Sequence, residues 1–200
     1  MTEVRNRAAA AFQAARAIAA GPLAEVALAV KRLGEGGAPV TVLDDATGRV
    51  IDLDLRGSDE TVLASLAALA SVFPDAAQDE AEAATPGPRG RGRPKLGVVA
   101  REVTLLPRHW DWLAAQPGGA SVALRKLVER ARRENADDDT LRSRREAAYR
   151  AMSALAADLA GFEGASRALF AGDEAGFRAL AGAWPADLSA YLTRLAFPRG

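Results

Sequence analysis

Apolar residues recur every three or four positions near the start of the chain, which is the spacing of an amphipathic helix. Over residues 3–19 the positions that keep this spacing are Val4, Ala8, Phe12, Ala15 and Ile18. The Gly21-Pro22 pair would end this helix and start a second one, which runs to Gly34. Glycine suits the left-handed cap that closes many helices. The pattern therefore predicts two helices before residue 35.

Two extended runs, Pro39–Leu43 and Arg49–Leu55, follow the predicted helices. Residues 44–48 between them contain two aspartates and a glycine, which suit a hairpin loop. In the second run apolar residues alternate with aspartates, as in a strand with one wet face. Ser58 can cap a third helix that carries two carboxylates in its first turn. We expect a compact N-terminal unit of helices and a β-hairpin over residues 1–74.

Helical spacing returns over residues 136–200, in a long pattern after Asp137–Asp139 and then in shorter ones. The shorter helices are expected to break at Gly161, at Gly172 and at Trp184-Pro185. The expected core of this region comprises Phe162, Phe170, Phe177, Leu180, Trp184, Leu188, Tyr191 and Leu195. The sequence thus predicts an α+β protein that is mainly helical.

Composition narrows the class of protein without identifying a function. The chain has 200 residues, of which 49% are hydrophobic and 26% charged, as in ordinary globular proteins. It contains no cysteine, so disulfides and thiolate metal sites are excluded, and we expect a reducing compartment, the cytoplasm. No stretch approaches the roughly 18 consecutive apolar residues that a membrane span needs, so we expect no membrane partner.

Charge is unevenly distributed along the chain, although 26 basic and 26 acidic residues cancel in total. Residues 1–85 carry 7 Lys/Arg against 13 Asp/Glu, residues 86–133 carry 11 against 3, and residues 134–200 carry 8 against 10. The corresponding net charges are −6, +8 and −2. A basic segment between acidic flanks is typical of polyanion binding, and chance clustering on a solvated face is the alternative.

Residues 75–97 form an acidic and then basic linker with almost no large apolar side chain to bury. Its basic end reads Arg-Gly-Arg-Gly-Arg-Pro-Lys over residues 89–95 and resembles an AT-hook. In that motif glycine lets the backbone approach the floor of the minor groove while arginines fill the narrow slot. The resemblance implies DNA contacts by Arg89, Arg91, Arg93 and Lys95. A flexible basic linker is the alternative.

Residues 98–135 resemble the ribbon-helix-helix family of DNA-binding proteins. The elements that carry the resemblance are a strand at Val98–Leu106, a helix opened by Pro107, and a Pro117-Gly118-Gly119 turn. A second helix follows, for which Ser121 is the expected N-cap. Trp110 and Leu113 would form the buried side of the first helix. The apolar stripe of the second helix comprises Ala120, Leu124, Leu127, Val128 and Ala131.

This second resemblance implies a homodimer, because the single strand has no partner in its own chain and pairs with a second copy. The paired strands would enter the major groove, and the N-terminus of the second helix would meet phosphate. The contacts implied by position are Arg101, Thr104, Arg108, Gly119, Ala120 and Ser121. The adjacent Leu105 and Leu106 leave the register of the strand undecided.

The whole chain also resembles an uncharacterised bacterial family, through the run Asp44–Arg49 with the Asp-Leu-Asp-Leu-Arg-Gly that follows it, and through Arg91–Arg108. That resemblance implies no activity. The single histidine, His109, lies beside Arg108 at the start of a predicted helix, and we expect it to have no catalytic role. The acidic cluster Asp44, Asp45, Asp52 and Asp54 could gather a hard cation if the hairpin brought its carboxylates together. Against that, the first two are ordinary turn residues and the last two alternate with apolar residues, as on a solvated strand face. We therefore expect no enzyme, no catalytic or metal-binding residue and no cofactor.

These observations together predict a cytoplasmic, homodimeric DNA-binding protein, either a transcription regulator or a nucleoid-type factor. The alternative is a protein-interaction adaptor, or an antitoxin-like factor, that uses the ribbon only to dimerise. In the DNA-binding protein the N-terminal and C-terminal regions would sense an effector, oligomerise or bind an unknown protein partner.

Overall fold

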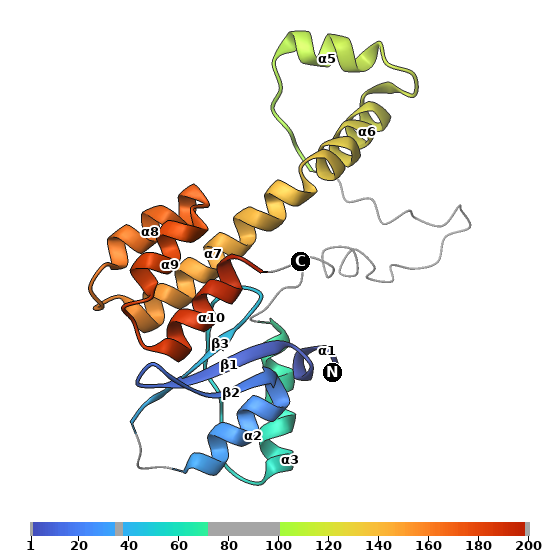
Figure 1. Ribbon diagram of the computed structural model, residues 1–200. Helices are drawn as coiled ribbons and strands as arrows, with labels where there is room; N and C mark the ends of the chain where they lie inside the picture. The colour runs from blue at the N-terminus through green and yellow to red at the C-terminus, as the bar shows by residue number, and fades with distance from the viewer. Residues whose placement is uncertain (1, 35–37, 72–100, 199–200) are drawn as a thin grey trace. The chain divides into compact units, whose positions relative to one another are not determined.

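The computed structural model describes residues 2–34, 38–71 and 101–198 (Figure 1). The chain divides into two compact units, one built from residues 1–70 and 138–200 and the other from residues 71–137. As the sequence predicts, the protein is α+β and mainly helical. Within the described ranges, every helix is too short or too polar to cross a membrane.

The N-terminal segment contains a β-hairpin where the sequence predicts a helix. After the short α1 (Thr2–Arg5), strands β1 (Ala8–Gln13) and β2 (Arg16–Pro22) pair antiparallel. The two residues between the strands, Ala14 and Ala15, both have a positive φ, as the tight turn of a hairpin requires. The prediction of a helix over residues 3–19 is therefore wrong.

Burial explains why this alanine-rich segment forms a strand. Alanine has the highest intrinsic helix propensity, and the spacing of the larger apolar residues fits a helix as well. In the structure, however, Ala9, Ala10 and Ala11 are successive residues of β1 and each is at most 1% exposed. A strand that is buried on both faces needs apolar side chains at every position. This packing on two faces outweighs the local helix propensity.

The remaining elements of the N-terminal segment follow the sequence prediction, except that the second strand is shorter. Helix α2 (Leu23–Leu33) is followed by strands β3 (Val40–Asp44) and β4 (Val50–Ile51), which pair as the expected hairpin. The strand predicted over Arg49–Leu55 ends at Ile51, and the Asp54 side chain accepts a hydrogen bond from the Arg56 N–H, as in a turn. Helix α3 (Asp59–Ser65) begins after Ser58, whose side chain accepts a hydrogen bond from the Thr61 N–H. A 3-10 helix over Leu66–Ser71 continues α3.

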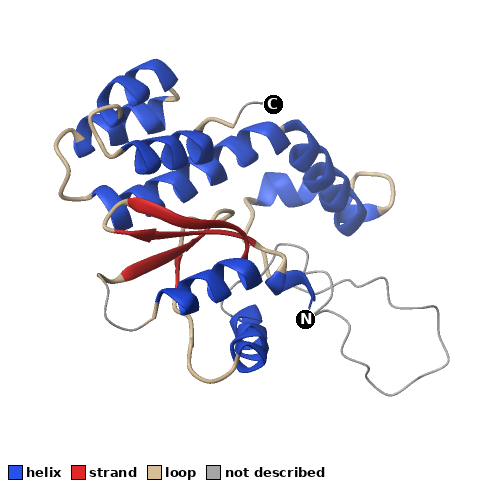
Figure 2. Ribbon diagram, turned by 60° about the horizontal axis from the view of Figure 1, so that its bottom comes forward, coloured by secondary structure: helices blue, strands red, loops and turns tan. Residues whose placement is uncertain are grey.

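The four strands form one antiparallel sheet in the order β2-β1-β3-β4, with helices on both faces (Figure 2). Alternate residues of the strands point to opposite faces. Ala10, Phe12 and Leu43 belong to the large hydrophobic core that the C-terminal helices complete. The intervening Ala9 and Ala11 point to the other face, which α2 covers. The central strands are thus enclosed on both sides.

Four helices make up the C-terminal region, namely α7 (Ala136–Ala156), α8 (Phe162–Ala171), α9 (Glu174–Ala181) and α10 (Ala186–Ala196). The predicted breaks are confirmed, because Gly161 and Gly172 cap the two ends of α8 and Trp184-Pro185 lies between α9 and α10. Most of the expected core residues pack inside this unit, but Phe170 and Leu180 are 50% and 37% exposed. Asp137–Asp139 lie within the first turn of α7, where acidic side chains favour the helix dipole.

The turn between β3 and β4 holds a fully buried carboxylate, that of Asp44. Both oxygens are bound by Arg7, with its Nη2 3.1 Å from Oδ2, and the Thr47 N–H and hydroxyl donate to Oδ2 as well. Burial of an ionised carboxylate is costly unless it is paired and hydrogen-bonded. Arg7 and Thr47 together satisfy this requirement.

The next residue, Asp45, links the turn to α10. Its two oxygens accept hydrogen bonds from the Tyr191 hydroxyl at 3.0 Å and from Arg194 Nη2 at 3.1 Å. Burial, together with the negative charge of Asp45, raises the pKa of Tyr191 above its ordinary value, so this hydroxyl remains a donor. Arg150 of α7 donates to the Thr47 carbonyl at 3.0 Å. The turn is therefore held by two C-terminal helices.

Gly48 closes the same turn directly against α7. Its φ is +66°, and a side chain at this position would overlap the backbone carbonyl of Ala147. Glycine is thus required twice over, for its backbone conformation and for the close approach of the helix.

We expect replacement of Gly48 by alanine to lower the free energy of unfolding by more than about 3 kcal/mol, because steric overlap adds to backbone strain. The matched control is Gly34, whose φ is +74° and whose added methyl group would meet no described atom within 4 Å. That control should lose only the backbone strain, about 1–3 kcal/mol. Urea unfolding followed by circular dichroism measures both values. Equal losses would contradict a structural role for the Gly48–Ala147 contact.

Candidate nucleic-acid interface

The second unit is described from residue 101 onward, and its elements are α5 (Pro107–Ala114) and α6 (Gly119–Glu134). Pro107 occupies the first position of α5, as predicted, where its missing N–H breaks no helical hydrogen bond. Residues 101–106 before it belong to neither a helix nor a strand. Because the predicted ribbon needs a second chain, its pairing stays a prediction.

Helix α6 begins earlier than the sequence predicts. Ser121 was expected to cap it, but Gly118 is the N-cap and Ser121 is the third helical residue. The cause is the glycine pair in the turn, since Gly118 and Gly119 have φ values of +88° and +75°. The Gly119 N–H donates to the Gln116 carbonyl at 2.9 Å, which closes the turn before Ser121 is reached.

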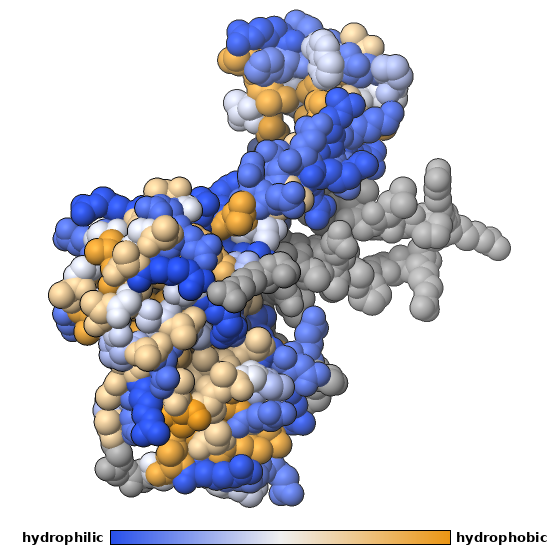
Figure 3. Space-filling model, in the orientation of Figure 1, coloured by the Kyte–Doolittle hydropathy of each residue, from blue (hydrophilic) through white to orange (hydrophobic). Residues whose placement is uncertain are grey.

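Few side chains are buried in the described part of this unit. Only Leu113 of α5 and Ala123 of α6 are buried there. Trp110, expected on the buried side of α5, is 39% exposed. The exposed large apolar residues of the unit are Val103, Leu106, Trp110, Trp112, Leu127 and Val128. Figure 3 shows hydrophobic residues between α5 and α6 with hydrophilic residues on either side. The two helices therefore leave much apolar surface in contact with water.

Positive charge lies beside this apolar surface. Helix α6 carries five basic residues, Arg125, Lys126, Arg130, Arg132 and Arg133, and two acidic ones, Glu129 and Glu134. Arg132 and Arg133 approach Glu129 at 3.9 and 3.8 Å, in pairs that are exposed to solvent. Within the described part of the chain, Arg125, Lys126 and Arg130 have no carboxylate partner. Most of the positive charge of α6 is thus not neutralised internally.

A groove of about 1250 Å³ combines the two kinds of surface. Its apolar lining is Val103, Leu124 and Val128, and the charged lining is Arg101, Arg125, Lys126, Glu129, Arg130, Arg133 and Glu134. The structure therefore brings Arg101, a residue predicted from the strand pattern to contact DNA, beside the basic residues of α6. Those α6 residues are not among the contacts that the sequence predicts.

The other predicted contacts have separate positions. Thr104 and Arg108 are exposed, one before α5 and the other in its first turn. Gly119, Ala120 and Ser121 form the first turn of α6, although the Gly119 N–H is already engaged within the turn. The linker over residues 75–97 and its AT-hook-like residues, Arg89, Arg91, Arg93 and Lys95, lie outside the described residues.

The residues considered for catalysis or metal binding do not converge. His109 is exposed in α5. Asp44 and Asp45 are bound by the separate partners already described, and Asp54 pairs with Arg56 at 2.8 Å, which lowers the pKa of its carboxyl to about 2. Among the residues that the structure describes, no group of three or more His, Cys, Asp or Glu is placed to hold a metal ion.

A family model described as "uncharacterized protein conserved in bacteria (DUF2239)" matches residues 8–196, which is nearly the whole chain. No curated protein and no solved structure matches this chain.

Proposed function

The chain belongs to this family of uncharacterised bacterial proteins, and we propose that it is a homodimeric, cytoplasmic DNA-binding protein. Its role would be that of a transcription regulator or a nucleoid-type factor. The observation that supports this most is the second unit, where exposed apolar residues and unneutralised cations share one groove. The apolar part would bind a second copy, and the cations would bind phosphate.

Dimerisation is favoured by the small number of buried residues in α5 and α6. A helical pair that buries two side chains cannot offset the conformational entropy that it loses on folding. Six large apolar residues of the same unit are exposed, and covering them with an identical surface would contribute roughly 25 cal/mol per Å² of apolar area. The extended residues 101–106 would pair with their copies at the same time.

DNA binding is favoured by charge. Arginine and lysine side chains that lack internal carboxylate partners can replace the counterions of a phosphate backbone. Two copies of α6 would double the number of such cations. The N-terminal turn of α6 would add backbone N–H groups of Ala120 and Ser121 for phosphate, and Arg101, Thr104 and Arg108 would lie closest to the groove of the DNA.

The alternative function is that of a protein-interaction adaptor or antitoxin-like factor, in which the same surface only dimerises. The acidic Glu129 and Glu134 in the groove lining favour this alternative, because carboxylates repel phosphate. Both functions require a dimer, but only the first requires that the purified protein binds DNA.

The dimer is tested by placing a charge on the exposed apolar face. Val128→Glu should convert a dimer at micromolar concentration into a monomer, because it would place a charge within the apolar contact between the two copies, where its desolvation is costly. Val50→Glu is the matched control, since Val50 of β4 is 55% exposed and Val128 is 57% exposed. Sedimentation velocity reports the oligomeric state. A wild-type protein that sediments as a monomer would contradict the proposal, and so would loss of the dimer in Val50→Glu.

DNA binding is tested by titrating the full-length protein against labelled duplex DNA at several salt concentrations. The affinity should fall steeply, with a log–log slope of about −0.9 for each phosphate contact, because each contact releases counterions. Electrophoretic mobility or fluorescence anisotropy measures it. If the dimer forms but no DNA binds at low salt, the adaptor function replaces the DNA-binding one.

Two pairs of substitutions separate the two basic segments. Arg91→Ala with Arg93→Ala should remove the preference for A·T-rich DNA, because a narrow minor groove attracts guanidinium groups. Arg101→Ala with Arg108→Ala should weaken binding to all sequences if these residues contact phosphate, or relax one base position by roughly 1–3 kcal/mol if they contact bases. The two double variants are compared on A·T-rich and mixed duplexes. A similar loss on every duplex for both would contradict the assigned groove contacts.

A further inference from the structure

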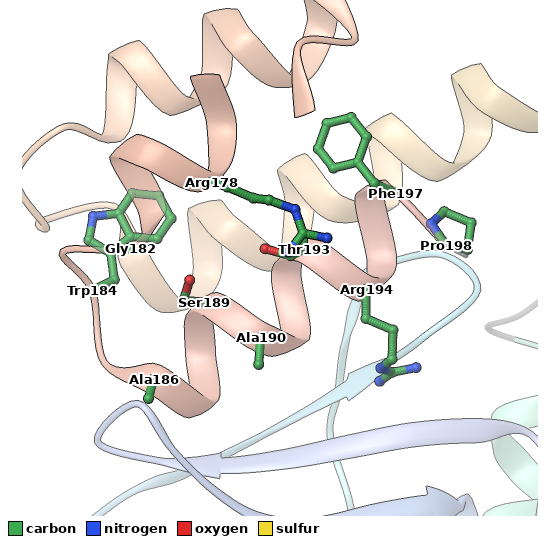
Figure 4. Close-up of a pocket in the computed structure, with 10 residues that line it drawn as sticks. All are labelled: Arg178, Gly182, Trp184, Ala186, Ser189, Ala190, Thr193, Arg194, Phe197 and Pro198. Atoms are coloured by element: carbon green, nitrogen blue, oxygen red, sulfur yellow. The ribbon is translucent and has the colours of Figure 1, made fainter. Parts of the chain in front are cut away.

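A pocket of about 750 Å³ lies between α9 and α10 in the first unit (Figure 4). Three small residues, Gly182, Ala186 and Ala190, leave space along its wall. Trp184 and Phe197 supply aromatic surface at its two ends, and the Trp184 Nε1 is engaged by the Ala160 carbonyl at 2.9 Å. The volume is within the range of about 300–1,000 Å³ that is usual for small-molecule sites.

Two hydroxyl groups line the pocket and have no hydrogen-bond partner among the described residues. Ser189 and Thr193 are four residues apart and therefore share one face of α10. Thr193 is only 6% exposed as a residue, and no described residue forms a hydrogen bond with either hydroxyl. Because both residues line the pocket, their hydroxyls are open to it and can donate to or accept from a ligand atom there.

Arg178 of α9 supplies a positive charge beside these hydroxyls. Its Nε and Nη2 donate to Glu174 Oε1 at 2.8 and 2.7 Å, which leaves Nη1 without an acceptor among the described residues. In Figure 4 the Arg178 side chain extends toward Thr193, whereas Arg194 points away toward the sheet. Arg194 is held there by Asp45 and lies over the Tyr191 ring. The lining residues include no carboxylate.

We propose that this pocket binds a small organic carboxylate with a flat apolar body. The carboxylate would accept hydrogen bonds from Arg178 Nη1 and from the Thr193 and Ser189 hydroxyls, since a carboxylate accepts several donors at once. The apolar body would lie against the aromatic surface at one end of the pocket, that of Trp184 or that of Phe197 (Figure 4). This site is in the first unit and does not depend on DNA binding, so it goes beyond the proposed function.

The experiment titrates the full-length protein with phenylacetate, followed by ligand-observed NMR, with 2-phenylethanol as the neutral analogue. For a ligand of this size we expect a Kd on the order of 1 mM. The neutral analogue should bind about tenfold more weakly, because it cannot form charge-assisted hydrogen bonds. Because no DNA is present, the outcome is independent of the test of the proposed function.

Two variants locate the binding. Arg178→Gln should weaken phenylacetate binding about tenfold or more, and Thr193→Val, which removes only the hydroxyl, should weaken it roughly threefold. Arg142→Gln is the matched control, because Arg142 also pairs with a carboxylate on its own helix but lies outside the pocket. Its affinity should equal that of the wild type. Absence of saturable phenylacetate binding, or wild-type affinity in Arg178→Gln, would overturn the proposal.

Discussion

The buried charge of Asp44 is the constraint on which the first unit depends. An ionised carboxylate in a dry interior needs several donors, and the chain supplies them from Arg7, just before β1, and from Thr47 within the turn. Asp45 extends the arrangement through Tyr191 and Arg194 of α10. The two ends of the chain therefore meet at one polar turn, where Gly48 allows α7 to approach closely.

The second unit presents the opposite balance of buried and exposed residues. The first unit pairs its buried carboxylate and encloses a large hydrophobic core within one chain. The described part of the second unit buries little and exposes both apolar side chains and cations. A surface of that kind is rare on a protein that acts alone, because contiguous exposed apolar residues mark sites of interaction. The proposed dimer and the proposed DNA contacts rest on this contrast between the two units.

Local signals in the sequence were sufficient where the structure depends on neighbouring residues. The Ser58 cap, the β3–β4 hairpin and the breaks at Gly161 and Gly172 are all confirmed, because each follows from backbone preferences within a few positions. The start of α6 was missed by three residues, since two glycines with positive φ close the turn early. At the candidate interface the sequence identified a basic segment, whereas the groove that joins Arg101 to α6 depends on folding.

The sequence by itself determined the fold class, most helix boundaries, the uneven distribution of charge along the chain and the position of the basic segment. Only the tertiary structure decided that Ala8–Gln13 is a strand, that residues 1–70 share a unit with residues 138–200, and that Ser189, Thr193 and Arg178 face one pocket. The physical reason is the separation along the chain over which each kind of interaction acts. Periodicity and capping act over a few residues, but alanine fits helix and strand alike. Its conformation is settled by what packs against both faces, which includes segments more than a hundred residues away.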